Sequence, residues 1–150
     1  DGDLDLYVAN GGYHDLKDGS SLLVDQVYQN DGNGTFMQAD QKNSFPNEGT
    51  AVVAIEDSNR DGSRVIFVGG SIVPGSYPNH YSNKLLFSNG NTDLIIDKKQ
   101  TEVLNTLEGI VRDALWTDID QDGTNDLILV GEWMPITVFL KKKWNSRKTN

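Results

Sequence analysis

The chain contains the acidic segment Asp118-Ile-Asp-Gln-Asp-Gly-Thr-Asn-Asp126, which runs directly into the apolar stretch 127–130. An earlier copy reads Asp57-Ser-Asn-Arg-Asp-Gly-Ser-Arg-Val65 and is followed by the apolar stretch 66–68. The chain opens with the second half of a third copy, Asp1-Gly-Asp-Leu-Asp5. The Asp-Gly pairs begin at positions 1, 61 and 122, so successive copies are 60 and 61 residues apart. A repeat of this length is typical of stacked supersecondary units, such as propeller blades or solenoid turns.

One complete repeat contains four short apolar stretches of strand length, at 51–55, 65–68, 85–87 and 94–96. The last two flank an Asn-Gly turn, which is a strong hairpin signal. Four antiparallel strands repeated in tandem predict an all-β fold built of β-propeller blades. The alternative is two or three hairpins in a β-sandwich, although a sandwich does not usually repeat its sequence.

The repeat also predicts the boundaries of the units. We expect a partial β-propeller of about two and a half blades: blade A at 1–50, truncated at its start, blade B at 51–109, and blade C at 110–150, truncated at its end. The rest of the propeller is then a partner of this chain. Helix is weakly indicated, with a turn or two expected at 102–107. Trp116 and Trp133 fall on expected strands, and we expect both side chains in the core.

Composition limits the functions open to the chain. It has 22 Asp and Glu against 13 Lys and Arg, a net charge of -9, which argues against nucleic acid as the main partner. No run approaches the ~18 apolar residues of a membrane span, so none is expected within this chain. The absence of cysteine excludes disulfides, thiol catalysis and Cys-based zinc sites.

The third acidic segment has the spacing of a cation site. Asp118, Asp120, Asp122 and Asp126 occupy its positions 1, 3, 5 and 9. Carboxylates packed this closely repel one another unless a cation neutralises them, and oxygen ligands at alternating positions suit Ca²⁺. Thr124, at position 7, would contribute its backbone carbonyl. The segment is not an EF-hand, because that motif needs Glu at position 12, which here is Leu129. The alternative is a solvated acidic turn that binds nothing.

The other two copies are weaker candidates. In the second copy, Asp57, Asn59 and Asp61 fill positions 1, 3 and 5, but Val65 at position 9 cannot ligate a metal. The first copy retains Asp1, Asp3 and Asp5 at positions 5, 7 and 9, so we do not expect it to form a complete site in this chain.

The repeated pattern Asp-x-Asp-x-Asp-Gly-x-x-Asp-Leu resembles the FG-GAP or VCBS repeats of integrin-like β-propellers. The closer resemblance is to the bacterial branch with ASPIC/UnbV-type and cartilage-acidic-protein-like chains. It rests on three segments: Asp3-Leu-Asp-Leu-Tyr-Val-Ala-Asn-Gly-Gly12, Phe67-Val-Gly-Gly-Ser-Ile-Val-Pro-Gly-Ser-Tyr-Pro78 and Asp126-Leu-Ile-Leu-Val-Gly-Glu-Trp-Met-Pro-Ile136. The resemblance implies a seven- or eight-bladed propeller with calcium in the loops that join the first two strands of a blade.

The same resemblance implies a secreted or cell-envelope protein that binds or scaffolds a protein or carbohydrate ligand at the cell surface. Two long loops, 9–25 and 71–83, carry aromatic side chains that could contact such a ligand: Tyr13, His14, Tyr77, His80 and Tyr81. Alternatively, these tyrosines cover a blade edge. Two other functions stay open: part of a propeller hydrolase or lyase acting on polysaccharide, or blades that only complete a ring.

Overall fold

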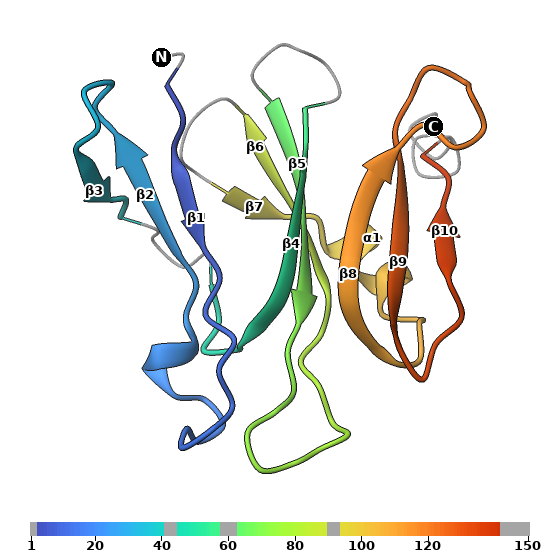
Figure 1. Cartoon of the computed structure of the whole chain (residues 1–150), viewed down its shortest axis with the longest axis horizontal. Helices are drawn as coiled ribbons and strands as arrows, with labels where there is room; N and C mark the ends of the chain where they lie inside the picture. Colours follow the sequence, from blue (N-terminus) through green and yellow to red (C-terminus); the bar gives the residue numbers. More distant parts are fainter. Residues whose placement is uncertain (1–2, 41–44, 58–62, 90–93, 142–150) are drawn as a thin grey trace.

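A computed structural model describes residues 3–40, 45–57, 63–89 and 94–141. The expected all-β fold is confirmed: these residues form three antiparallel sheets, none of them closed (Figure 1). The first sheet has the order β1-β2-β3, the second β4-β5-β6-β7 and the third β10-β9-β8. The strands are β1 (Leu6–Val8), β2 (Gln26–Asn30), β3 (Phe36–Gln38), β4 (Thr50–Glu56), β5 (Ser63–Gly70), β6 (Lys84–Asn89), β7 (Leu94–Ile96), β8 (Ile110–Thr117), β9 (Asp126–Glu132) and β10 (Thr137–Phe139).

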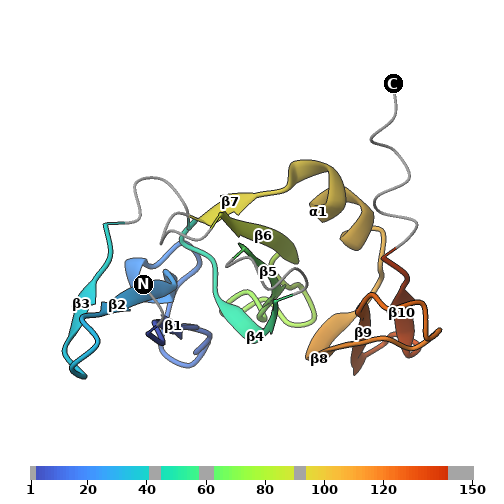
Figure 2. The ribbon, with the colours of Figure 1, turned by 90° about the horizontal axis from the view of Figure 1, so that it is seen from above.

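The second sheet is buried on both faces. Side chains alternate along a strand, so neighbouring residues of β5 point to opposite faces. Phe67 packs with Leu85 and Leu127 in a cluster that joins the second and third sheets. Ile66 packs with Val27 in a cluster that joins the second and first sheets. Figure 2 shows the three sheets side by side in chain order, with β3, β7 and β10 diverging from one another. This arrangement explains why the strands of the second sheet read as almost continuous apolar runs.

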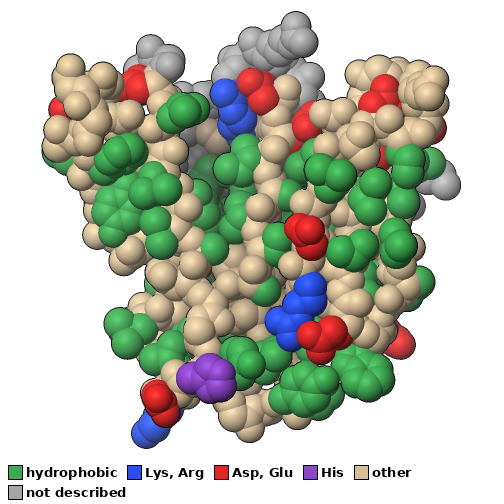
Figure 3. Space-filling view, in the orientation of Figure 1, with side chains coloured by type: hydrophobic (Ala, Val, Ile, Leu, Met, Phe, Trp, Pro, Cys, Tyr) green, Lys and Arg blue, Asp and Glu red, His purple; other side chains and the backbone are tan. Residues whose placement is uncertain are grey.

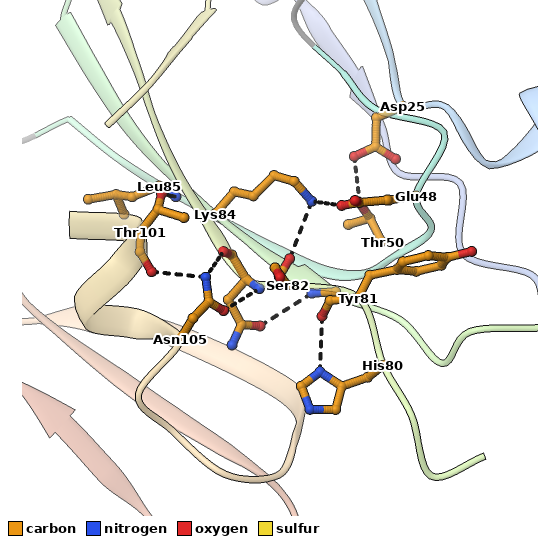
Figure 4. Close-up of polar contacts among 12 residues, drawn as sticks. Asp25, Glu48, Thr50, His80, Tyr81, Ser82, Lys84, Leu85, Thr101 and Asn105 are labelled. Carbon is orange, nitrogen blue, oxygen red and sulfur yellow. Dashed lines mark hydrogen bonds and ion pairs between the residues drawn. The ribbon is translucent and has the colours of Figure 1, made fainter. Parts of the chain in front are cut away.

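A buried carboxylate ties the first sheet to the second. Asp25, only 5% exposed, accepts hydrogen bonds from the hydroxyls of Tyr7 and Thr50, both at 2.6 Å, and from the backbone N–H of Asn10 at 2.8 Å. Burial of the ring, followed by the nearby charge of Asp25, raises the pKa of Tyr7 well above its usual value. Figure 4 shows the bond between Asp25 and Thr50 beside the ion pair of Lys84 with Glu48.

The helical segment differs from the expectation. Helix α1 (Lys98–Leu104) begins four residues before the expected 102–107. Asp97 caps it by accepting a hydrogen bond from the backbone N–H of Gln100, which satisfies a donor that the first turn leaves unpaired. Leu104 is fully buried in the cluster between the second and third sheets, and packing therefore determines where the helix lies. No helix in the described part of the chain combines the length and apolar character needed to cross a membrane.

Gly70, at the end of β5, has no room for a side chain, and this generates a stability prediction. A Cβ there would overlap the backbone carbonyl of Tyr81. Gly70→Ala should therefore lower the free energy of unfolding by about 1–3 kcal/mol, measured by urea denaturation. Gly12→Ala is the control, because a Cβ at Gly12 meets nothing within 4 Å, and its effect should stay within about 0.5 kcal/mol. Equal effects of the two substitutions would contradict the packing described here.

Candidate functional site

The third acidic segment forms the loop between β8 and β9, at the upper end of the sheets in Figure 1. Two residues of the loop have left-handed backbone conformations, Gln121 with φ 59° and Gly123 with φ 88°. Glycine adopts this conformation without steric cost, which accounts for Gly123 at the turn. The loop thereby folds back on itself and brings its first and last residues together.

The structure brings together Asp118, Asp120 and Asp126. One carboxylate oxygen of each lies within 4.8 Å of the others, while the burial differs, from 1% exposed for Asp126 to a solvent-exposed Asp120. Calcium binds oxygens at about 2.3–2.6 Å, so two oxygens on one ion are at most about 5 Å apart. The three oxygens are therefore close enough to share one cation, and a cation would relieve their mutual repulsion.

Backbone donors hold two of these carboxylates in place. Asp118 accepts from the N–H groups of Asp122, at 3.0 Å, and Gly123, at 2.8 Å. Asp126 accepts from Ile119 at 3.3 Å and from Lys141, beyond the end of β10, at 2.9 Å. The partial positive charge of these N–H groups offsets part of the carboxylate charge. The geometry of the site therefore rests on the loop backbone and on the chain that follows β10.

Asp122 and Thr124, which the sequence also predicts as ligands, are hydrogen-bonded to each other within the loop. Asp122 lies outside the group of three carboxylates, and its Oδ1 accepts hydrogen bonds from the backbone N–H of Thr124 at 2.8 Å and from the Thr124 hydroxyl at 2.6 Å. These bonds close a local turn of the type that Asp favours. In this conformation the two residues stabilise the loop.

The other two acidic segments are only partly described. Asn59, Asp61 and Asp1 lie outside the described residues. Asp57 forms an ion pair with Arg64 at 3.1 Å, so an arginine already balances its charge. Asp5 accepts a hydrogen bond from the backbone N–H of Asn30 at 3.0 Å and thereby links β1 to β2.

The acidic loop also contacts the second sheet, through residues that the sequence pattern did not single out. The Asn125 side-chain amide donates to both carboxylate oxygens of Glu56, at 3.1 and 2.9 Å, and Glu56 is only 5% exposed. Beside it, the Trp116 indole N–H donates to the Ala54 carbonyl at 3.1 Å. In the sequence, this contact was indicated only by an acidic residue, Glu56, directly after the apolar stretch 51–55. A buried carboxylate needs such a partner, so the loop and β4 constrain each other.

The long loops lie at the opposite, lower end of Figure 1. Tyr81 is 8% exposed, and its hydroxyl donates to Asp18 at 2.7 Å, which joins loop 71–83 to loop 9–25. Tyr13 and Tyr77 are 42% and 57% exposed. The expectation that Trp133 belongs to the core is wrong: it is 76% exposed, because β9 ends at Glu132 and the chain turns outward. Trp116, by contrast, packs against the core.

Comparison of the chain with models of protein families, with curated proteins and with solved structures gives no match. The function proposed below therefore rests on the residues of this chain.

The bond between Asn125 and Glu56 generates a prediction about stability. Asn125→Ala leaves the buried carboxylate of Glu56 without its amide partner and should lower the free energy of unfolding by about 1–3 kcal/mol in urea denaturation. Asn33→Ala, in an exposed turn, is the control and should cost less. When Glu56→Gln is already present, Asn125→Ala should lower the free energy of unfolding by less. The neutral side-chain amide that then stands at position 56 is less costly to bury unpaired than a carboxylate. Strictly additive losses would contradict a direct interaction.

The buried hydroxyl of Tyr81 should make the stability of the fold depend on pH in the alkaline range. Burial of its ring, and then its bond to Asp18, raise the pKa of Tyr81 from 10.0 to about 12. The folded state thus favours the neutral phenol, so this contribution to stability is complete below pH 10 and is lost as the pH rises to 12. Tyr81→Phe should cost about 1 kcal/mol at pH 8 but lose less stability than the parent between pH 10 and 12. Urea denaturation across this range measures both effects, and parallel losses would count against the assignment.

Proposed function

We propose that the chain is part of an FG-GAP/VCBS-type β-propeller of the ASPIC/UnbV or cartilage-acidic-protein-like branch, in a secreted or cell-surface binding or scaffolding protein. Its three sheets would be successive blades, and Ca²⁺ would stabilise the loop between β8 and β9. The single observation that carries the calcium proposal is the approach of Asp118, Asp120 and Asp126 to within 4.8 Å.

Three features support the assignment to propeller blades. The acidic segments recur at 60 and 61 residues, in phase with the sheets. The second sheet has four antiparallel strands in chain order, as a blade has. Both of its faces pack against neighbouring sheets, as expected of repeats that cannot bury their apolar faces alone.

The chemistry of the loop supports calcium and an extracellular location. The three carboxylates are hard oxygen ligands on a loop of turn residues, and flexible coordination geometry suits Ca²⁺ better than Mg²⁺. Asp122 and the Thr124 carbonyl, by their positions in the segment, are the next ligands in the proposed set. Extracellular calcium modules bind with dissociation constants of about 10⁻⁴–10⁻³ M, and such sites fill where Ca²⁺ is millimolar, outside the cytoplasm.

A calcium titration tests the role of the loop. In thermal unfolding, Ca²⁺ at about ten times its Kd should raise the Tm by about 3–6 °C relative to excess EDTA, because the ion binds only the folded loop. Mg²⁺ at the same concentration should raise it less. Asp120→Asn should lose most of the rise, yet in EDTA it should be at least as stable as the parent, since one repulsive charge is gone.

Glu102→Gln is the matched control for this experiment, because it removes one negative charge from an exposed position on α1. It should keep the full response to Ca²⁺. If Ca²⁺ leaves the Tm of the parent protein unchanged, or raises the Tm of Asp120→Asn as much as that of the parent, the loop does not bind calcium.

A further inference from the structure

The end of the molecule opposite the acidic loop presents aromatic and paired polar side chains around two adjoining hollows. The loops that join β5 to β6 and β9 to β10 lie at this end, together with loop 9–25 (Figure 1). One hollow, of about 530 Å³, is lined by residues that include Tyr77, His80 and Trp133. The other, of about 520 Å³, includes Tyr13, Arg112 and Glu132 in its lining and shares Tyr77 with the first. We call these six side chains the aromatic face.

Trp133 is held in an exposed position. Its indole N–H donates to the Tyr77 hydroxyl at 3.1 Å, which connects the turn after β9 to loop 71–83. Its backbone has φ 61°, a conformation that is unfavourable for a residue with a Cβ and that concentrates at functional sites. The ring is nevertheless 76% exposed, so burial does not offset this cost. An exposed aromatic ring on a backbone conformation of this kind is a feature expected of a ligand contact.

An ion pair lies beside the rings. Arg112 Nε donates to Glu132 Oε1 at 2.7 Å, and the two side chains are 37% and 43% exposed. Arginine carries five N–H donors, of which Nε uses only one, and a carboxylate offers several acceptor positions. The pair therefore presents adjacent donors and acceptors with no net charge. Figure 3 shows oppositely charged side chains next to hydrophobic ones towards the lower edge of the molecule.

A carbohydrate combines the features that this face would recognise. The C–H bonds of a pyranose ring make an apolar face that can lie on a tryptophan or tyrosine ring, whose amphipathic surface tolerates water at its edge. Sugar hydroxyls both donate and accept, which matches a guanidinium next to a carboxylate. Binding pockets of about 300–1,000 Å³ are usual for small ligands, so two adjoining hollows suit a short run of sugar rings.

Charge decides which carbohydrate fits. The charges of Arg112 and Glu132 cancel, and the whole chain has a net charge of -9, so an anionic polysaccharide would meet overall repulsion. We propose that the aromatic face binds a neutral polysaccharide, with Trp133 and Tyr77 stacking on sugar rings and Arg112 and Glu132 bonding to hydroxyls. This deepens the proposed binding role by naming the ligand class, and it does not require calcium at the acidic loop.

Affinity electrophoresis of the full chain in gels that contain neutral polysaccharides tests the proposal. The probes are hydroxyethyl cellulose, xyloglucan, laminarin, galactomannan and soluble starch, with alginate as the anionic comparison and casein as the peptide comparison. At least one neutral polymer should retard the protein, and alginate and casein should not. Trp133→Ala and Arg112→Gln should each lower the affinity for that polymer at least tenfold.

Phe36→Ala removes a ring that is 46% exposed, in the hairpin at the other end of the molecule, and it should keep the affinity within twofold. The thermal unfolding midpoint of each variant separates lost binding from lost folding. Binding in EDTA should equal binding in Ca²⁺, so failure of the calcium proposal would leave this result unchanged. No retardation by any neutral polymer, stronger retardation by alginate or casein, or unchanged binding by folded Trp133→Ala and Arg112→Gln would overturn the proposal.

Discussion

Ile66 and Phe67 are neighbours on β5, yet their side chains enter hydrophobic clusters on opposite faces of the second sheet. A sheet with both faces apolar cannot remain in water alone, so it requires a neighbour on each side. The first and third sheets supply those neighbours, and Leu104 of α1 extends one of the two contacts. The remaining structure depends on this packing, because it fixes which loops lie beside one another.

Buried polar groups make the packing between sheets specific. Apolar contact is non-directional and does not by itself select one alignment. Asp25 accepts a hydrogen bond from Thr50 between the first and second sheets, and Glu56 accepts hydrogen bonds from Asn125 between the second and third sheets. A misaligned pair of sheets would bury a carboxylate without its partner, which is costly. Asn125 belongs to the acidic loop, so the contact that aligns the second and third sheets also positions the candidate cation site.

Alternating strand direction separates the two candidate sites. In the third sheet, the loop between β8 and β9 lies at one end, and the loop between β9 and β10 lies at the other, where the loop between β5 and β6 also lies (Figure 1). Carboxylates therefore gather at the end where Asp118 and Asp126 meet. The aromatic side chains of Tyr77 and Trp133 lie at the opposite end, where the carboxylate of Glu132 is paired with Arg112.

The sequence by itself determined the strands of the second sheet and the acidic loop, because both depend on residues close together in the chain. Short apolar runs and Asp-Gly turns are local features. The partner of Glu56, the bond from Lys141 to Asp126 and the burial of Leu104 depended on contacts between distant segments. Trp133 shows the difference most clearly: its apolar character indicated the core, but only the tertiary structure decided that β9 ends before it and that Tyr77 holds its ring at the surface.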